Sequence, residues 1–204
     1  VIVVNTPSNP TGFVFNKQRL KEILDFVEDF SMFMVSDEAY EDFILKGKHV
    51  SPASINGERV LSVFSLSKTY GLTGLRIGYV VVPNKDLAKQ IKIMQLHTYV
   101  CPTSIAQYLA LICIRERLER EYINQWIEII RTNVKVLDEI LSKRNIKWIM
   151  PEGGIYVWFP LPNMDTAMFA DVLLDKKKVG IAVGEDFGTK WLSLIHISEP
   201  TRPR

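Results

Sequence analysis

The sequence predicts an α/β protein in which a mainly parallel sheet is followed by a smaller α+β unit. Three observations lead to this fold class. Short apolar segments rich in valine and isoleucine alternate with a helical pattern before Pro83, polar motifs follow these segments where they end, and the pattern after Pro83 is mostly helical. Alternating strands and helices are typical of parallel sheets. Strands of this composition are typical of a sheet that is covered on both faces.

The segments that we expect to form the sheet are short and apolar, and a helical stretch separates the first two. Residues 16–30 predict a helix, because Leu20, Ile23, Leu24 and Val27 recur at the spacing of one helical face. In open sheets of this class, ligands bind at the carboxyl ends of the strands, so we expect a site there. The predicted strands are 1–5, 31–40, 59–66 and 76–83.

After Pro83 the chain is predicted to form three successive helices and then a smaller mixed unit. The third helix, at 119–145, is long enough to link two domains. We therefore predict part of a large domain over residues 1–120 and a smaller, truncated domain over residues 121–191. The expected elements are helices at 84–100, 104–118 and 119–145, strands at 146–150 and 153–162, a helix at 165–178 and a short strand at 179–184.

The two ends of the chain differ in style from the rest. The chain opens on VIVVN, a buried-strand pattern with nothing before it to pair with, so we expect a piece of a longer protein. Near the other end, LSLIHISEPTR (192–202) resembles the translation of a transposase-type sequencing adapter, read past the end of a DNA insert. We therefore predict that residues 192–204 are a non-native tail and leave them out of the fold prediction.

Composition argues against several kinds of partner. Hydrophobic residues make up 47% and charged residues 24% of the chain, as in ordinary globular proteins. The net charge of +2 gives no reason to expect nucleic acid or an acidic membrane surface. No apolar run approaches the roughly 20 residues that span a bilayer. Cys101 and Cys113 make neither a disulfide framework nor a metal-ligand cluster, so we expect reduced thiols in a cytoplasmic protein without a metal.

Lys68 stands in an unusual setting for a surface lysine. It lies in SVFSLSKTYGLTGLRIGYVVVP (62–83), between two apolar runs and among glycines. Ser65 and Ser67 precede it, and Arg76 follows eight residues later. A lone loop lysine is most often solvated, so its importance depends on the rest of the chain.

Two further polar motifs follow predicted strands. Asn9 lies in NPTG, where Pro10 fixes its own φ and Gly12 allows a tight turn, so the turn is able to aim an amide side chain. Asp37 ends an apolar strand in DEAY, ahead of Tyr40, and a carboxylate emerging from a buried strand needs a cationic or hydrogen-bonding partner. Each motif alone is a weak signal, but with the lysine stretch they match the demands of one cofactor.

The three motifs together resemble the class I/II aminotransferases. NPTG, DEAY and SLSK followed at eight residues by Arg76 look like these pyridoxal-phosphate (PLP) enzymes of fold type I, and the resemblance runs from Val1 to about Gly188. PEGGIYVWFPLP (151–162) also matches the family's small domain. The resemblance implies the aspartate-aminotransferase-like PLP-transferase fold, PLP as cofactor, an amino acid and a 2-oxo acid as substrates, and a homodimer. The segment from DEAY onward leans toward the aspartate-aminotransferase-like branch.

The resemblance implies roles for the residues around the cofactor ring. Lys68 would hold PLP through a Schiff base and, once freed by the substrate amine, would take the α-proton and return it. Asp37 would pair with the pyridine nitrogen and keep it protonated. Tyr40 and Asn9 would hydrogen-bond the phenolic oxygen of the ring.

The resemblance likewise implies a phosphate site. Ser65 and Arg76 would hold the phosphate, since arginine is suited to a bidentate grip. Ser67 is a further candidate, although it could equally be a small residue that packs beside the lysine. Tyr70 and Thr73 are interpreted as loop structure.

Alternatives share parts of the same pattern. PLP lyases and synthases of this fold carry the set of Lys68, Asp37 and Arg76, and PLP-binding transcription regulators use the fold as a sensor domain. Acyl-transferring relatives usually have histidine where Tyr40 stands, which counts against them. The family's amino-terminal half and its substrate-carboxylate arginine find no match here, so we expect the chain by itself neither to transaminate nor to fold stably.

Overall fold

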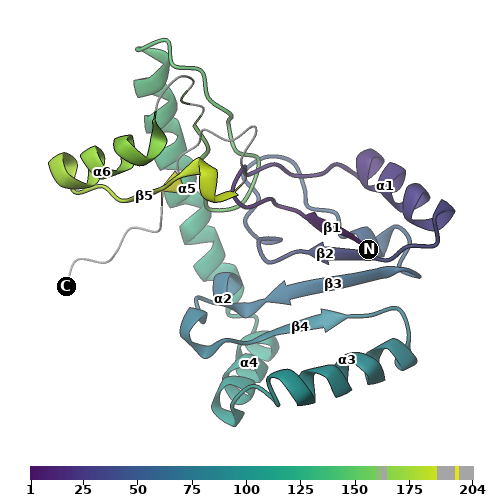
Figure 1. Ribbon diagram of the computed structural model, residues 1–204. Coiled ribbons are helices and arrows are strands. Elements are labelled where there is room, and N and C mark those ends of the chain that lie inside the picture. The colour runs from purple at the N-terminus through teal and green to yellow at the C-terminus, as the bar shows by residue number, and fades with distance from the viewer. Residues whose placement is uncertain (160, 162–164, 188–195, 198–204) are drawn as a thin grey trace.

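The computed structural model describes residues 1–159, 161, 165–187 and 196–197. Its main sheet has four strands in the order β1-β2-β3-β4 (Figure 1). β1 and β3 both run parallel to β2, whereas β4 runs antiparallel to β3. The prediction of a mainly parallel sheet is therefore confirmed. The bounds are Ile2–Asn5 for β1, Met34–Asp37 for β2, Val60–Ser65 for β3 and Gly78–Val81 for β4.

Helix α1, Lys17–Asp29, supplies the main apolar cover of the first three strands. The side chain of Asn16 caps it by accepting a hydrogen bond from a backbone N–H of the first turn. Its apolar face packs on Val4, Met34 and Val60, one from each of the parallel strands. Burying each such aliphatic side chain contributes about 1.5–3 kcal/mol. The predicted helical face is confirmed, with Leu20, Leu24 and Val27 buried and Ile23 partly buried against them.

The other predicted helices also form, each within three residues of the expected ends. Asn84, Thr103 and Asp165 cap α3, α4 and α6 with their side chains. α4 and α6 end at Arg117 and Lys178, both in the left-handed conformation that commonly stops a helix. The bounds are Lys85–Thr98 for α3, Ser104–Glu116 for α4, Glu119–Ser142 for α5 and Thr166–Lys177 for α6. The short helix α2, Leu66–Thr69, was not predicted.

Two predicted strands are wrong. In the described parts of residues 146–150 and 153–162, the structure has isolated bridges in place of ladders, namely Ile149 with Trp158 and Gly153 with Ile44. Gly154 has φ +78°, which interrupts an extended run. Val157, Trp158 and Phe159 are instead buried together in one cluster, with Trp148 packed against it, so the hydrophobicity of these residues reflects core packing.

The short strand expected at 179–184 appears as β5, Ile181–Ala182, which pairs antiparallel with β6, His196–Ile197. β6 lies inside the segment that we predicted to be a non-native tail. The remaining residues of that segment lie outside the described part of the chain, and its origin stays a prediction.

Helix α5 joins the two parts of the chain (Figure 1). Near its start, Ile123 is buried with Tyr40 and Phe43, which follow β2. Farther along, Val134 is buried with Trp158 in the cluster of the C-terminal part. The helix therefore packs on both sides of the predicted boundary near residue 120, and the division into 1–120 and 121–191 stays a prediction.

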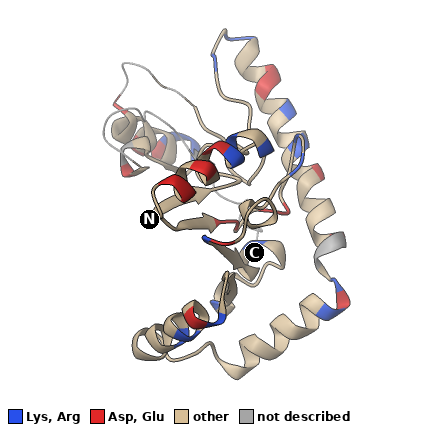
Figure 2. Ribbon diagram, turned by 90° about the vertical axis from the view of Figure 1, so that its right-hand side faces the viewer, with Lys and Arg blue, Asp and Glu red and all other residues tan. Residues whose placement is uncertain are grey.

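Much apolar surface is exposed beyond these clusters. All four residues of β4 are exposed, and Val1 and Val3 are 80% and 69% exposed. Within the described residues, the sheet is therefore not covered on both faces as its composition predicted. Acidic and basic residues are interspersed along α1, α3 and α5 (Figure 2). None of the described helices is both long and apolar enough to cross a bilayer.

Candidate active site at the carboxyl edge of the sheet

One edge of the sheet gathers all the predicted site residues. Asn5 pairs in register with Asp37, so β1 and β2 end side by side. β3 ends next to them at Ser65, which pairs with Gly78 at the start of the antiparallel β4. The segments that leave β1, β2 and β3 and the segment that enters β4 therefore begin at the same edge. The sequence placed the candidate site at this edge, because parallel strands end together there.

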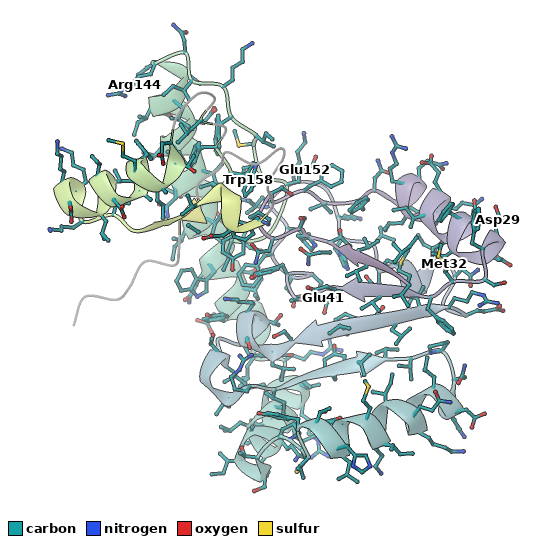
Figure 3. The ribbon with its side chains drawn as sticks, viewed as in Figure 1. Asp29, Met32, Glu41, Arg144, Glu152 and Trp158 are labelled. Carbon is teal, nitrogen blue, oxygen red and sulfur yellow. The ribbon has the colours of Figure 1, made fainter. Side chains whose placement is uncertain are left out.

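The turn after β1 carries Asn9 and is docked against the C-terminal part of the chain. Gly12 has φ +70°, which its lack of a side chain allows, and its N–H donates to the carbonyl of Ser8 at 2.8 Å. The Gly12 carbonyl accepts hydrogen bonds from the backbone N–H groups of Glu152 and Gly153, each at 2.9 Å. Figure 3 shows Glu152 on the side of this edge where α5 and α6 lie.

Asn5 ties the Asn9 turn to the end of β2. Its side-chain carbonyl accepts a hydrogen bond from the Asn9 N–H, and its side-chain amide donates to the Asp37 carbonyl at 3.2 Å. The sequence interpretation missed this residue, because it treated Asn5 only as the last position of a strand. An asparagine at a strand end, four residues before the turn, is the signal that could have found it.

Asp37, the last residue of β2, and Tyr40, in the turn that follows, lie at this edge. Asp37 is partly buried, and its Oδ1 accepts a hydrogen bond from the Ala39 N–H at 3.1 Å. Tyr40 is 6% exposed, and its hydroxyl lies 2.7 Å from the hydroxyl of Tyr156. The two rings pack edge to face at 5.5 Å. Tyr156 is a second residue that sequence reasoning missed, since no local pattern links positions so far apart.

The segment between β3 and β4 brings the two serines and the arginine into contact. Ser65 caps α2 by accepting a hydrogen bond from the Ser67 N–H at 3.2 Å. Arg76 is in the left-handed conformation, with φ 52°, and its Nη1 lies 3.4 Å from the Ser67 hydroxyl and 3.0 Å from the Thr73 carbonyl. Thr73 also donates from its hydroxyl to the Ser67 carbonyl at 3.1 Å. Thr73, interpreted only as loop structure, therefore helps to shape this group.

Lys68 follows on α2 and lies beside a pocket of about 330 Å³. The pocket walls are mostly apolar and include Phe43, Trp126 and Ile155. Ligand pockets of this size and character are common. Among the predicted site residues, all of which the structure describes, only Lys68 lines it.

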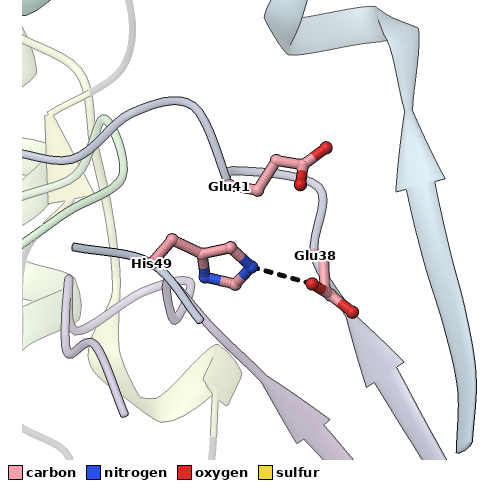
Figure 4. A group of neighbouring side chains, drawn as sticks. All are labelled: Glu38, Glu41 and His49. Carbon is pink, nitrogen blue, oxygen red and sulfur yellow. Dashed lines mark hydrogen bonds and ion pairs between the residues drawn. The ribbon is translucent and has the colours of Figure 1, made fainter. Parts of the chain in front are cut away.

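A group of acidic side chains and a histidine lies next to this edge (Figure 4). Donor atoms of Glu38, Glu41 and His49 lie within 4.8 Å of one another, the type of set that could hold a metal ion. Both Glu38 oxygens are already engaged, by His49 at 2.7 Å and by Ser51 at 3.0 Å. We therefore treat the group as an internal network.

The pKa values of the two glutamates move in opposite directions. Burial favours a higher pKa for Glu38, but hydrogen bonds, that from His49 foremost, outweigh burial and lower it. Burial, followed by the negative charge of Asp42, raises the pKa of Glu41 to about 7. Burial, followed by the negative charges of Glu41, Asp42 and Glu38, also raises the pKa of the Tyr79 hydroxyl.

The fold and this edge define a class of protein that the family comparison identifies. The chain belongs to the family described as aminotransferase class I and II, whose family model matches residues 1–200. The prediction of the family, made from NPTG, DEAY and the Lys68–Arg76 stretch, is therefore confirmed. The match extends into residues 192–204, the segment that we predicted to be a non-native tail.

Several named relatives match most of the length of the chain. It is 30% identical to an aspartate aminotransferase of Pyrococcus abyssi over 98% of this chain and 52% of the relative. It is 28% identical to aromatic-amino-acid aminotransferase 2 of Thermococcus litoralis, over 98% of this chain and 52% of the relative. A probable aspartate/prephenate aminotransferase of Aquifex aeolicus is 34% identical over 92% of this chain and 50% of its own. The chain thus spans about half the length of these relatives.

Solved structures show the same fold. An aromatic aminotransferase from Pyrococcus horikoshii superposes with a TM-score of 0.87 at 29% identity, over 96% of this chain and 54% of that one. A double mutant of the Thermus thermophilus aspartate aminotransferase superposes with a TM-score of 0.88 at 30% identity, over 96% and 51%. The aspartate-aminotransferase-like fold predicted from the motifs is therefore confirmed. The names of these proteins do not favour the lyase, synthase or regulator alternatives.

Proposed function

We propose that this chain carries the cofactor-binding and proton-transfer residues of a PLP-dependent aminotransferase. The observation that carries the proposal is the convergence of an amine, a carboxylate and a serine–arginine group on one sheet edge, in a member of a PLP-dependent family. When bound, PLP supplies an electron-accepting ring that makes the α-proton of an attached amino acid acidic. The complete protein would exchange an amino group between an amino acid and a 2-oxo acid.

The residues that we assign to the phosphate have hydrogen-bond donors that suit PLP. A guanidinium carries five N–H donors, and the bonds of Arg76 to Ser67 and Thr73 hold it beside the serines. The Ser65 hydroxyl accepts a bond from the Ser67 N–H and keeps its own proton to donate. Two hydroxyls and an arginine together suit a phosphate dianion.

The ring contacts fit as well. The Asp37 carboxylate accepts one bond from the Ala39 N–H and has lone pairs left for a protonated ring nitrogen. The Tyr40 hydroxyl, held by Tyr156, and the Asn9 amide, on its docked turn, would bond the phenolic oxygen. A hydroxyl both donates and accepts, so the bond to Tyr156 leaves Tyr40 able to make a second one.

Lys68 is the residue that we assign to covalent attachment and proton transfer. Lys68 lines a mostly apolar pocket of the size that small ligands occupy. A primary amine in this position can bind an aldehyde and, once released, can take a proton and give it back.

Substrates, assembly and compartment belong to the same proposal. The names of the relatives, which include aspartate, aromatic amino acids and prephenate, support an amino acid and a 2-oxo acid as substrates. Exposed apolar residues such as Ile105 and Tyr108 on α4 support a protein that buries this surface, as a homodimer would. We also infer a cytoplasmic location, as predicted from the cysteine content.

The experiment that tests the proposal is chemical trapping on the complete gene product. We expect borohydride reduction in the presence of PLP, followed by peptide mapping, to place a pyridoxyl group on Lys68. The Lys68→Ala variant should lose the label, while the exposed Lys46 serves as a matched control whose substitution keeps it. A label on any other lysine, or none at all, would overturn the assignment.

A further inference from the structure

Glu38 is a carboxylate in an unusual place. It directly follows β2 in the turn that carries Asp37 and Tyr40, yet it is only 1% exposed. Successive side chains alternate across a sheet, so Glu38 continues the buried face of Met34 and Ser36 while Asp37 belongs to the other face. One turn therefore carries a candidate cofactor contact on one face and a buried acid on the other.

Three of the four polar groups of Glu38 hold this turn to neighbouring segments, and the fourth, its carbonyl, bonds within the turn. Its Oε2 lies 2.7 Å from Nε2 of His49, and its Oε1 accepts a hydrogen bond from Ser51 at 3.0 Å. Its backbone N–H donates to the carbonyl of Val63 in β3 at 2.9 Å, and its carbonyl accepts from the Glu41 N–H at 3.0 Å. Figure 4 shows that His49 reaches Glu38 from a separate segment of the chain.

Such a buried pair is an expensive way to hold two segments together. Moving a carboxylate out of water costs more than its attraction to a partner usually returns, and an apolar pair of similar volume often stabilises a fold as well or better. The pair supplies something that apolar packing lacks, namely short directional bonds that fix one geometry. The His49 side chain is 11% exposed and that of Glu38 fully buried, so water competes little for these bonds.

We propose that Glu38 and His49 are positioning residues that hold the Asp37–Tyr40 turn in the orientation needed for cofactor contact. The inference rests on the proposed function, because it concerns residues assigned to the PLP ring. With the buried side of the turn anchored to residues 49–51, Asp37 keeps its bond to the Ala39 N–H. Without the anchor the turn would remain in place but would tilt, and both ring contacts would loosen.

The test uses the complete gene product and two variants, Glu38→Gln and the double variant Glu38→Met/His49→Leu, which replaces the pair by apolar volume. Val60→Ala is the matched control, because Val60 is buried in the same layer but belongs to the α1 core. We expect at least tenfold faster hydrogen exchange at the amides of Ala39 and Glu41 in both variants. We also expect the pH at which the bound cofactor's visible absorption changes to shift by at least about half a unit.

The control should lose stability while leaving both readouts unchanged. Unchanged exchange and an unchanged absorption pH in the two variants would overturn the proposal. Loss of folding in both would overturn it as well, because the pair would then serve stability and not position. If the unsubstituted protein shows no cofactor band, the proposed function fails, and the exchange rates alone still decide whether Glu38 and His49 hold the turn.

Discussion

Replacing Gly12 by alanine should loosen the docked turn that carries Asn9. Gly12 has φ +70°, and an alanine forced into that region costs about 1 kcal/mol. The added Cβ would lie 2.6 Å from Cβ of Pro151 and 3.0 Å from the carbonyl oxygen of Gly153. Ordinary carbon contacts are about 3.5–4.0 Å, so one segment has to move by close to an ångström.

The expected loss of stability follows from these contacts. Overpacking of this kind costs about 1–3 kcal/mol. Separation of the segments also strains the two bonds to the Gly12 carbonyl, each of which contributes about 0.5–1.5 kcal/mol. We therefore expect Gly12→Ala to lower the free energy of unfolding by about 3–5 kcal/mol.

Gly47 provides the matched control. Its φ is +79°, and a Cβ added there would meet nothing within 4 Å, so Gly47→Ala isolates the backbone term of about 1 kcal/mol. The assay is urea unfolding of the complete gene product, with the slope compared between variants. Equal losses for the two substitutions would refute the reasoning, because the contact with the 151–154 segment would then contribute nothing.

Three further predictions concern charged residues at or near the edge. Glu41 holds its proton up to a pKa of about 7 in the folded state, against 4.5 ordinarily, so its contribution to stability should fall as pH rises between these values. The free energy of unfolding of Glu41→Gln, measured relative to the unsubstituted protein by chemical unfolding, should therefore be about 1–3 kcal/mol higher at pH 8 than at pH 5. A difference that does not change with pH would contradict this. Arg76→Ala should weaken PLP binding about 10- to 100-fold in a spectroscopic titration, while the exposed Arg19→Ala should not, and equal affinities would argue against a phosphate role. Asp37→Ala should slow turnover by about 10³-fold in steady-state kinetics, with the exposed Asp25→Ala as control, and near-normal turnover would remove Asp37 from the ring contacts.

The placement of the site was predictable because strand ends are local and parallel strands end together. Asp37 and Ser65 end apolar runs, so their meeting at one edge follows from the fold class. The motif around Lys68 could be read in the same way, since its serines and arginine lie within a few residues of it.

The rest depended on contacts between distant segments. The run 153–162 is apolar and short, and such a run fits a strand or a packed loop equally well. The pairing of Tyr40 with Tyr156 leaves no local pattern in either segment. A glutamate in an ordinary turn sequence gives no sign of burial, because the burial of Glu38 depends on the partner that His49 provides.

The carbonyl of Gly12 couples the position of the Asn9 turn to that of the 151–154 segment. Two peptide N–H groups of the 151–154 segment donate hydrogen bonds to this one oxygen. The bond from the Val14 N–H to Glu152 joins residues 138 positions apart. Any displacement of the C-terminal segment relative to the sheet has to carry the turn with it or break these bonds. The position of Asn9 at the sheet edge would then depend on the position of the C-terminal segment.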